Sequence, residues 1–96
     1  MVKWDTFIPA AFEYDFDSDK LATHHVTFDE AVQCFFSDYR VRRNKKFKDR
    51  YQLIGGTLNG RKLKIIFQLK SGNPVRIITG GHYETSQEAS DRRGDR

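Results

Sequence analysis

The sequence predicts a small α+β domain, in which one or two N-terminal helices pack on one face of an antiparallel four-stranded sheet. A capping box and an apolar stripe predict a helix at 27–37, and four later segments alternate with the period of a strand. Short turn sequences join these segments, which is typical of a meander. The 96 residues include eight Phe and four Tyr, enough for one modest core. We expect residues 1–84 to form the domain and the polar residues 85–96 to form a disordered tail.

The chain begins with an arm at 1–10 and a short strand. Phe12-Glu13-Tyr14 alternates between apolar and polar residues, and the segment 15–19 then collects residues that favour helix N-caps. These residues predict a short helix over about 17–24, which ends at two adjacent histidines.

The helix at 27–37 has the strongest local signals. Thr27 and Glu30 have the spacing of a capping box, and Val26 is placed as a hydrophobic staple onto Ala31. An apolar stripe at helical spacing predicts that one side of this helix faces the core. Its members are Phe28, Ala31, Val32, Phe35 and Phe36.

Four strands are predicted in the second half of the chain. They span 39–43, 50–57, 62–69 and 75–79. Asn59-Gly60 predicts a tight hairpin between the second and third of these strands, and Ser71-Gly72-Asn73-Pro74 predicts the next turn. Gly55-Gly56 lies late in a strand with no helix after it, so we interpret the pair as a bulge or strand end rather than a phosphate loop.

Alternation along these strands sorts the side chains onto two faces. One face is apolar and takes Val41, Tyr51, Leu53, Leu63, Ile65, Phe67, Leu69, Val75 and Ile77. The other is polar and takes Arg40, Arg42, Arg50, Gln52, Lys62, Lys64, Gln68 and Arg76. We expect the helix to cover the apolar face, and we expect Ile66 and Ile78 to interrupt the polar one.

Charge is strongly segregated along the chain. Residues 1–38 hold two lysines against eight acids, whereas residues 39–81 hold twelve Lys and Arg against one acid, within a net charge of +4. Such a basic block predicts a surface for a polyanion, with nucleic acid as the first candidate. The alternative interpretation is a solvated face without a specific ligand.

Several of these segments together resemble the BrnT-type toxins of bacterial toxin–antitoxin modules, which are similar in fold to RelE ribonucleases. The resemblance covers roughly residues 11–80. It is carried by Phe12-Glu13-Tyr14-Asp15, by the segment from His24-His25-Val26-Thr27 to Ala31, by Phe35-Phe36, by Arg50-Tyr51-Gln52-Leu53-Ile54-Gly55, by the aliphatic strand at 63–69 and by Val75-Arg76-Ile77-Ile78-Thr79. The chain departs from that family at Tyr14, where the family has Trp, and after Thr79, where Gly80-Gly81-His82 replaces a small residue and an arginine.

The resemblance implies an endoribonuclease toxin that cleaves RNA without a metal or other cofactor. It also implies a cognate BrnA-like antitoxin partner, itself similar to DNA-binding repressors, and it allows an oligomer within the toxin–antitoxin complex. Two alternatives stay open: a non-catalytic nucleic-acid-binding module, and a degenerate toxin whose remaining role is to bind the antitoxin. The sequence lacks a run of about 18 apolar residues or a signal peptide, and its single Cys34 forms no internal disulfide, so we expect a cytoplasmic protein without membrane contact.

Metal-independent RNA cleavage needs an acid, a base and cations, which His and Arg supply best. The predicted catalytic residues are His24 or His25 as the acid–base group, with Arg50 and Arg76 on the scissile phosphate. The predicted RNA-binding residues are Arg40, Arg42, Arg61, Lys62, Lys64 and Tyr83. The alternatives are that the histidines only cap a helix and that the arginines pair with the acidic N-terminal third. No metal site is expected, because His24, His25, Cys34 and His82 lack the spacing of metal ligands.

Overall fold

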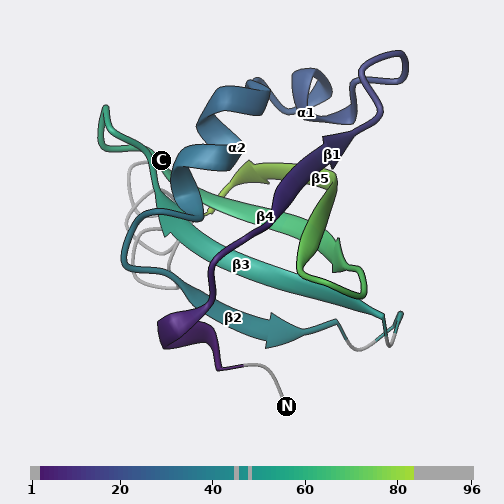
Figure 1. Cartoon of the computed structure of the whole chain (residues 1–96). Coiled ribbons are helices and arrows are strands. Elements are labelled where there is room, and N and C mark those ends of the chain that lie inside the picture. Colours follow the sequence, from purple (N-terminus) through teal and green to yellow (C-terminus); the bar gives the residue numbers. More distant parts are fainter. Residues whose placement is uncertain (1–2, 45, 48, 84–96) are drawn as a thin grey trace.

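The protein has two helices packed on a five-stranded mixed sheet, preceded by a short 3-10 turn (Figure 1). The computed structural model describes residues 3–44, 46–47 and 49–83, so the tail predicted at 85–96 lies outside the described residues. The elements are a 3-10 turn (Trp4–Thr6), β1 (Ala11–Tyr14), α1 (Lys20–Thr23), α2 (Phe28–Cys34), β2 (Arg40–Arg43), β3 (Arg50–Gly56), β4 (Lys62–Leu69) and β5 (Pro74–His82). The predicted α+β class is confirmed.

The sheet has the strand order β1-β5-β4-β3-β2. Strands β2 to β5 form the expected antiparallel meander, but the prediction of a four-stranded sheet was wrong, because β1 adds a fifth strand parallel to β5. The β1–β5 pair aligns Phe12 with Val75 and Tyr14 with Ile77. Partners more than sixty residues apart leave no local pattern in the sequence, whereas the hairpins are set by their turns.

Strand β5 also extends three residues beyond its predicted end at Thr79. A register shift between Ile66 and Phe67 of β4 inserts Ile78 as an extra residue in β5. After this bulge, the two strands continue to pair until Leu63 meets His82. The extension brings His82 into the sheet, which matters for the site below.

Both helices are shorter than predicted. In α2 the capping box is present, since the Glu30 amide donates to Thr27 Oγ1 at 3.1 Å and the Thr27 amide donates to Glu30 Oε1 at 3.1 Å. The helix ends at Cys34, and the turn that follows leaves Phe36 71% exposed, so its placement in the core stripe was wrong. Cys34, one position off that stripe, is fully buried instead.

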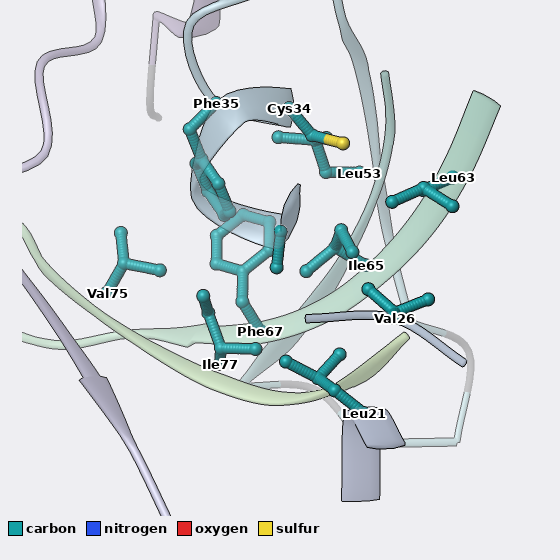
Figure 2. Close-up of a cluster of buried hydrophobic side chains, with 11 residues drawn as sticks. Leu21, Val26, Cys34, Phe35, Leu53, Leu63, Ile65, Phe67, Val75 and Ile77 are labelled. Carbon is teal, nitrogen blue, oxygen red and sulfur yellow. The ribbon is translucent and has the colours of Figure 1, made fainter. Parts of the chain in front are cut away.

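The core lies between the helices and one face of the sheet (Figure 2). Leu21 of α1 and Phe35, which follows α2, pack in one cluster with Phe67 and Ile77 of the sheet, and all four are buried. Every residue assigned to the apolar face is buried or half-buried, as the alternation predicts. In the part of the chain described here, no helix is long and apolar enough to span a membrane.

Gly55 allows α2 to approach β3 closely. A Cβ at this position would lie 2.9 Å from the Cys34 carbonyl oxygen and 2.8 Å from Ser37 Oγ. Ser37 Oγ donates to the Cys34 carbonyl at 2.8 Å and accepts from the Gly56 amide at 3.1 Å. Gly55 is therefore the point where α2 packs on β3, and Gly56 is the last residue of that strand, in agreement with the strand-end interpretation.

Candidate nucleic-acid interface

The sheet presents a row of cations on the face opposite α2, which we call the cationic face. Strand register places its basic residues on the same side, since Arg50 aligns with Gln68, and Gln68 with Arg76. Its members are Arg40, Arg42, Arg50, Lys62, Lys64 and Arg76. The predicted sorting of charges onto one face is therefore confirmed. Ile54 and Ile66 lie among these cations, and Ile54 is only 8% exposed.

Most of these cations have no acidic partner within the part of the chain that the structure describes. Among the described residues, Arg76 is the one member of the cationic face with an acid in ion-pair range, at 3.8 Å from Glu13. Glu13 binds Lys70 more closely, at 2.9 Å, and this hydrogen bond is the main cause that lowers the pKa of the Glu13 carboxyl. Arg50 stacks on the Phe47 ring, with the guanidinium carbon 4.3 Å from the ring centroid. The acidic N-terminal third therefore compensates little of the positive charge.

One hollow at the end of β5 is lined by two histidines and a lysine, and we call it the histidine hollow. It has a volume of about 330 Å³. Its lining residues are His24, Lys64, Ile66, Thr79, Gly80, Gly81 and His82. His82 pairs with Leu63 of the apolar face, whereas Lys64 lies on the cationic face. His24 caps the C-terminus of α1, which packs on β5, and His82 is the last residue of β5. Both histidines and Lys64 are exposed, so a ligand in the hollow can reach them from solvent.

Gly81 leaves room for the His24 ring. A Cβ on Gly81 would lie 3.6 Å from His24 Cβ and 3.8 Å from His24 Nδ1. Because Gly81 pairs with Lys64, the absent side chain would point to the same face as the lysine. The His24 ring therefore lies against the sheet backbone next to Lys64.

A second hollow holds the two arginines predicted to be catalytic, and we call it the arginine hollow. It is lined by Asp15, Ser18, Lys20, Arg50, Arg76, Ile77 and Ile78, with a volume of about 210 Å³. The structure thus brings Arg50 and Arg76 together, as expected, but it does not place them with either histidine.

His25 and Arg61 lie outside both hollows, at the junction between the helices and the β3–β4 hairpin. His25 has a positive φ of 60°, and its carbonyl accepts a hydrogen bond from Arg61 Nη1 at 3.0 Å. The same nitrogen donates to both Glu30 carboxylate oxygens at 2.8 Å. The Thr27 amide and Arg61 together lower the pKa of the Glu30 carboxyl, against desolvation by burial. Through these hydrogen bonds, Arg61 links the junction between the two helices to the β3–β4 hairpin.

The other predicted RNA-binding residues are dispersed. Arg40 and Arg42 lie exposed on the edge strand β2, and Lys62 lies exposed at the start of β4. Tyr83 follows β5, is half-buried, and donates its amide to the Lys62 carbonyl at 2.9 Å. These residues extend the basic surface but line neither hollow.

Sequence reasoning missed Lys20 as a site residue and left His82 outside the site. The short helix α1 carries Lys20 and His24, so its packing beside β5 delivers one residue to each hollow. No pattern of neighbouring residues predicts that α1 packs beside β5. An extension of the last predicted strand beyond Thr79 would have been the one available signal that His82 belongs to the sheet.

Within the described ranges, no three His, Cys, Asp or Glu side chains are grouped as metal ligands. Comparison with protein-family models and with curated proteins gives no match to this chain. A functional assignment therefore depends on the geometry above and on the motifs of the sequence.

Proposed function

We propose that this protein is a metal-independent endoribonuclease with a BrnT-like fold, acting as the toxin of a type II toxin–antitoxin module. The observation that carries the proposal is that His24, His82 and Lys64 all line the histidine hollow at the end of β5. Two imidazoles and an ammonium group suit the cleavage of RNA by its own 2′-hydroxyl.

The proposed reaction uses the two histidines as base and acid. One imidazole takes the 2′-hydroxyl proton, and the 2′-oxygen attacks the adjacent phosphorus to form a 2′,3′-cyclic phosphate. The bond from phosphorus to the 5′-oxygen breaks, and the imidazolium of the other histidine protonates the leaving oxygen. Histidine is the side chain most often used as a general acid or base, because an imidazole can both accept and donate a proton. Lys64 stabilises the negative charge on the phosphorane oxygens.

The toxin assignment is supported by the order of elements and by the motifs in residues 11–80. On this proposal the protein acts in the cytoplasm and is neutralised by a BrnA-like antitoxin encoded by a neighbouring gene. Expression of the chain alone should arrest growth, and coexpression of that gene should restore it. Full growth without the antitoxin, at verified expression of the protein, would contradict the toxin assignment.

Single histidine variants test the catalytic part. We expect His24→Ala and His82→Ala to lower RNA cleavage about 100-fold or more, the usual range for loss of a general acid or base. His25→Ala is the matched control, because His25 is adjacent in sequence but lies outside the hollow. Cleavage by the purified protein is measured with EDTA present. Equal losses for His24→Ala and His25→Ala, or full activity of both hollow variants, would overturn the assignment.

The unpaired cations favour a second candidate, a nucleic-acid-binding module without cleavage. This alternative predicts RNA binding that weakens steeply with salt, with a log–log slope of about −0.7 per neutralised phosphate of a single strand. RNA that stays intact after prolonged incubation with a high concentration of the protein would favour the binding module over the nuclease.

A further inference from the structure

We infer that the arginine hollow is a second phosphate site, which anchors a phosphodiester of the RNA other than the one that is cleaved. This inference rests on the proposed RNA-directed function and deepens it. The hollow gathers three cations from separate elements: Lys20 from α1, Arg50 from β3 and Arg76 from β5. Two guanidinium groups and one ammonium group match the oxygen-rich surface of a phosphate.

The acids near this hollow are largely engaged elsewhere. Asp15 lines the hollow, but its Oδ1 accepts the amides of Asp17 and Ser18, each at 3.2 Å, and its Oδ2 accepts Ser18 Oγ at 2.6 Å. The bonds from Ser18 are the main cause of the lowered pKa of this carboxyl, and the charge of Arg76 adds a smaller effect, so Asp15 stays charged.

Glu13 is the second acid, and it aligns with Arg76 across the β1–β5 pair without lining the hollow. Its carboxylate lies 2.9 Å from Lys70 Nζ and 3.8 Å from Arg76 Nη1. Arg76 is therefore only loosely paired, and a phosphate would bind it without breaking the shorter Glu13–Lys70 contact. Three cations remain against the one carboxylate that lines the hollow.

The two hollows lie next to each other along β5. Ile78 lines the arginine hollow and Thr79 lines the histidine hollow, so the sites adjoin at the bulge. Arg76 and Gly81 are five residues apart, which corresponds to about 16 Å of extended strand. A single phosphate cannot touch both ends of that span. An RNA strand following β5 would place one phosphate in each hollow.

In this arrangement one hollow holds the RNA and the other cleaves it. Substrates of different length therefore test the inference, because a short RNA cannot reach both hollows. The double variant Lys20→Gln/Arg76→Gln should raise KM for a decanucleotide about tenfold or more, the usual effect of losing charged hydrogen bonds, with kcat changed less than threefold. On a dinucleotide, which has a single phosphodiester, the variant should equal the parent. Arg43→Gln is the control, since it removes a charge from β2 at a position that pairs with Tyr51 of the opposite face.

Binding of a 2′-O-methylated decanucleotide separates this inference from the nuclease proposal, because that RNA cannot be cleaved through its 2′-oxygen. We expect the double variant to bind it about tenfold more weakly, with Arg43→Gln changed less than threefold. This result would support the anchor even if the parent cleaved no RNA. Equal loss in the Arg43→Gln control would overturn the anchor, and so would a dinucleotide rate that falls as far as the decanucleotide rate.

Discussion

The substitution Gly55→Ala tests how tightly α2 is held against the sheet. The added Cβ would lie 2.8 Å from Ser37 Oγ, 2.9 Å from the Cys34 carbonyl oxygen and 3.2 Å from Leu53 Cδ2. Contacts below 3.0 Å require movement, and the Cys34 oxygen belongs to the backbone of the last helical turn. The helix end must therefore shift, which also disturbs the hydrogen bond from the Gly56 amide to Ser37 Oγ.

Overpacking of this kind costs about 1–3 kcal/mol. Taking about 2 kcal/mol, the melting temperature of a domain this size should fall by roughly 8–16 °C. Gly56→Ala is the matched control, because its Cβ would meet only the Arg61 carbonyl oxygen, at an ordinary 3.6 Å. We expect the control to change stability by less than about 1 kcal/mol.

Urea and thermal unfolding followed by circular dichroism measure both variants. Two results would refute the reasoning: a Gly55→Ala protein as stable as the parent, or equal destabilisation by the two substitutions. The first would show that α2 does not approach β3 this closely in solution. The second would show that the loss comes from the strand backbone and not from helix contact.

Three further experiments test other contacts that stabilise the fold, two by substitution and one by chemical labelling. The pKa of the Glu30 carboxyl is held below its usual value of 4.5, so ionised Glu30 stabilises the fold. This stabilisation is complete above the unfolded-state pKa and is lost as the pH falls through the folded-state pKa. The parent should therefore lose stability toward acid more steeply than Glu30→Gln in urea unfolding at pH 7 and pH 3, and parallel losses would contradict this. Burial raises the pKa of the Cys34 thiol to about 11, so iodoacetamide at pH 8 should label the native protein far more slowly than the urea-unfolded protein, and equal rates would exclude a buried thiol. Phe67 is fully buried, and Phe67→Ala should cost about 3–5 kcal/mol in urea unfolding; a loss below about 1 kcal/mol would be inconsistent with its place in the core.

Local sequence signals predicted much of the fold. The capping box at Thr27 and Glu30 fixes the start of α2 through bonds between residues three apart. The Asn59-Gly60 turn sets the β3–β4 hairpin, and alternation then sorts the side chains of β4, and those of β5 as far as Ile77, onto two faces. These features depend on neighbours in sequence, so a single sequence contains the information they need.

The candidate site was predicted only in part. The cationic face follows from alternation, and Arg50 and Arg76 do share a hollow. The pairing of His24 with His82 and Lys64 was not predicted, because it depends on how far β5 continues and where α1 packs. Arg61 looked like a free cation in the sequence, whereas its partner Glu30 lies 31 positions away.

The sequence by itself determined the class of the domain, the helix start, the hairpins and the segregation of charge onto one face, because each is encoded by residues within a few positions of one another. Only the tertiary structure decided that β1 joins the sheet parallel to β5, that α1 lies beside β5, and that one hollow holds Arg50 and Arg76 while another holds Lys64. These features arise from contacts between distant segments. Their stability comes from the shared core, to which Leu21 and Ile77 both belong, and not from any local pattern.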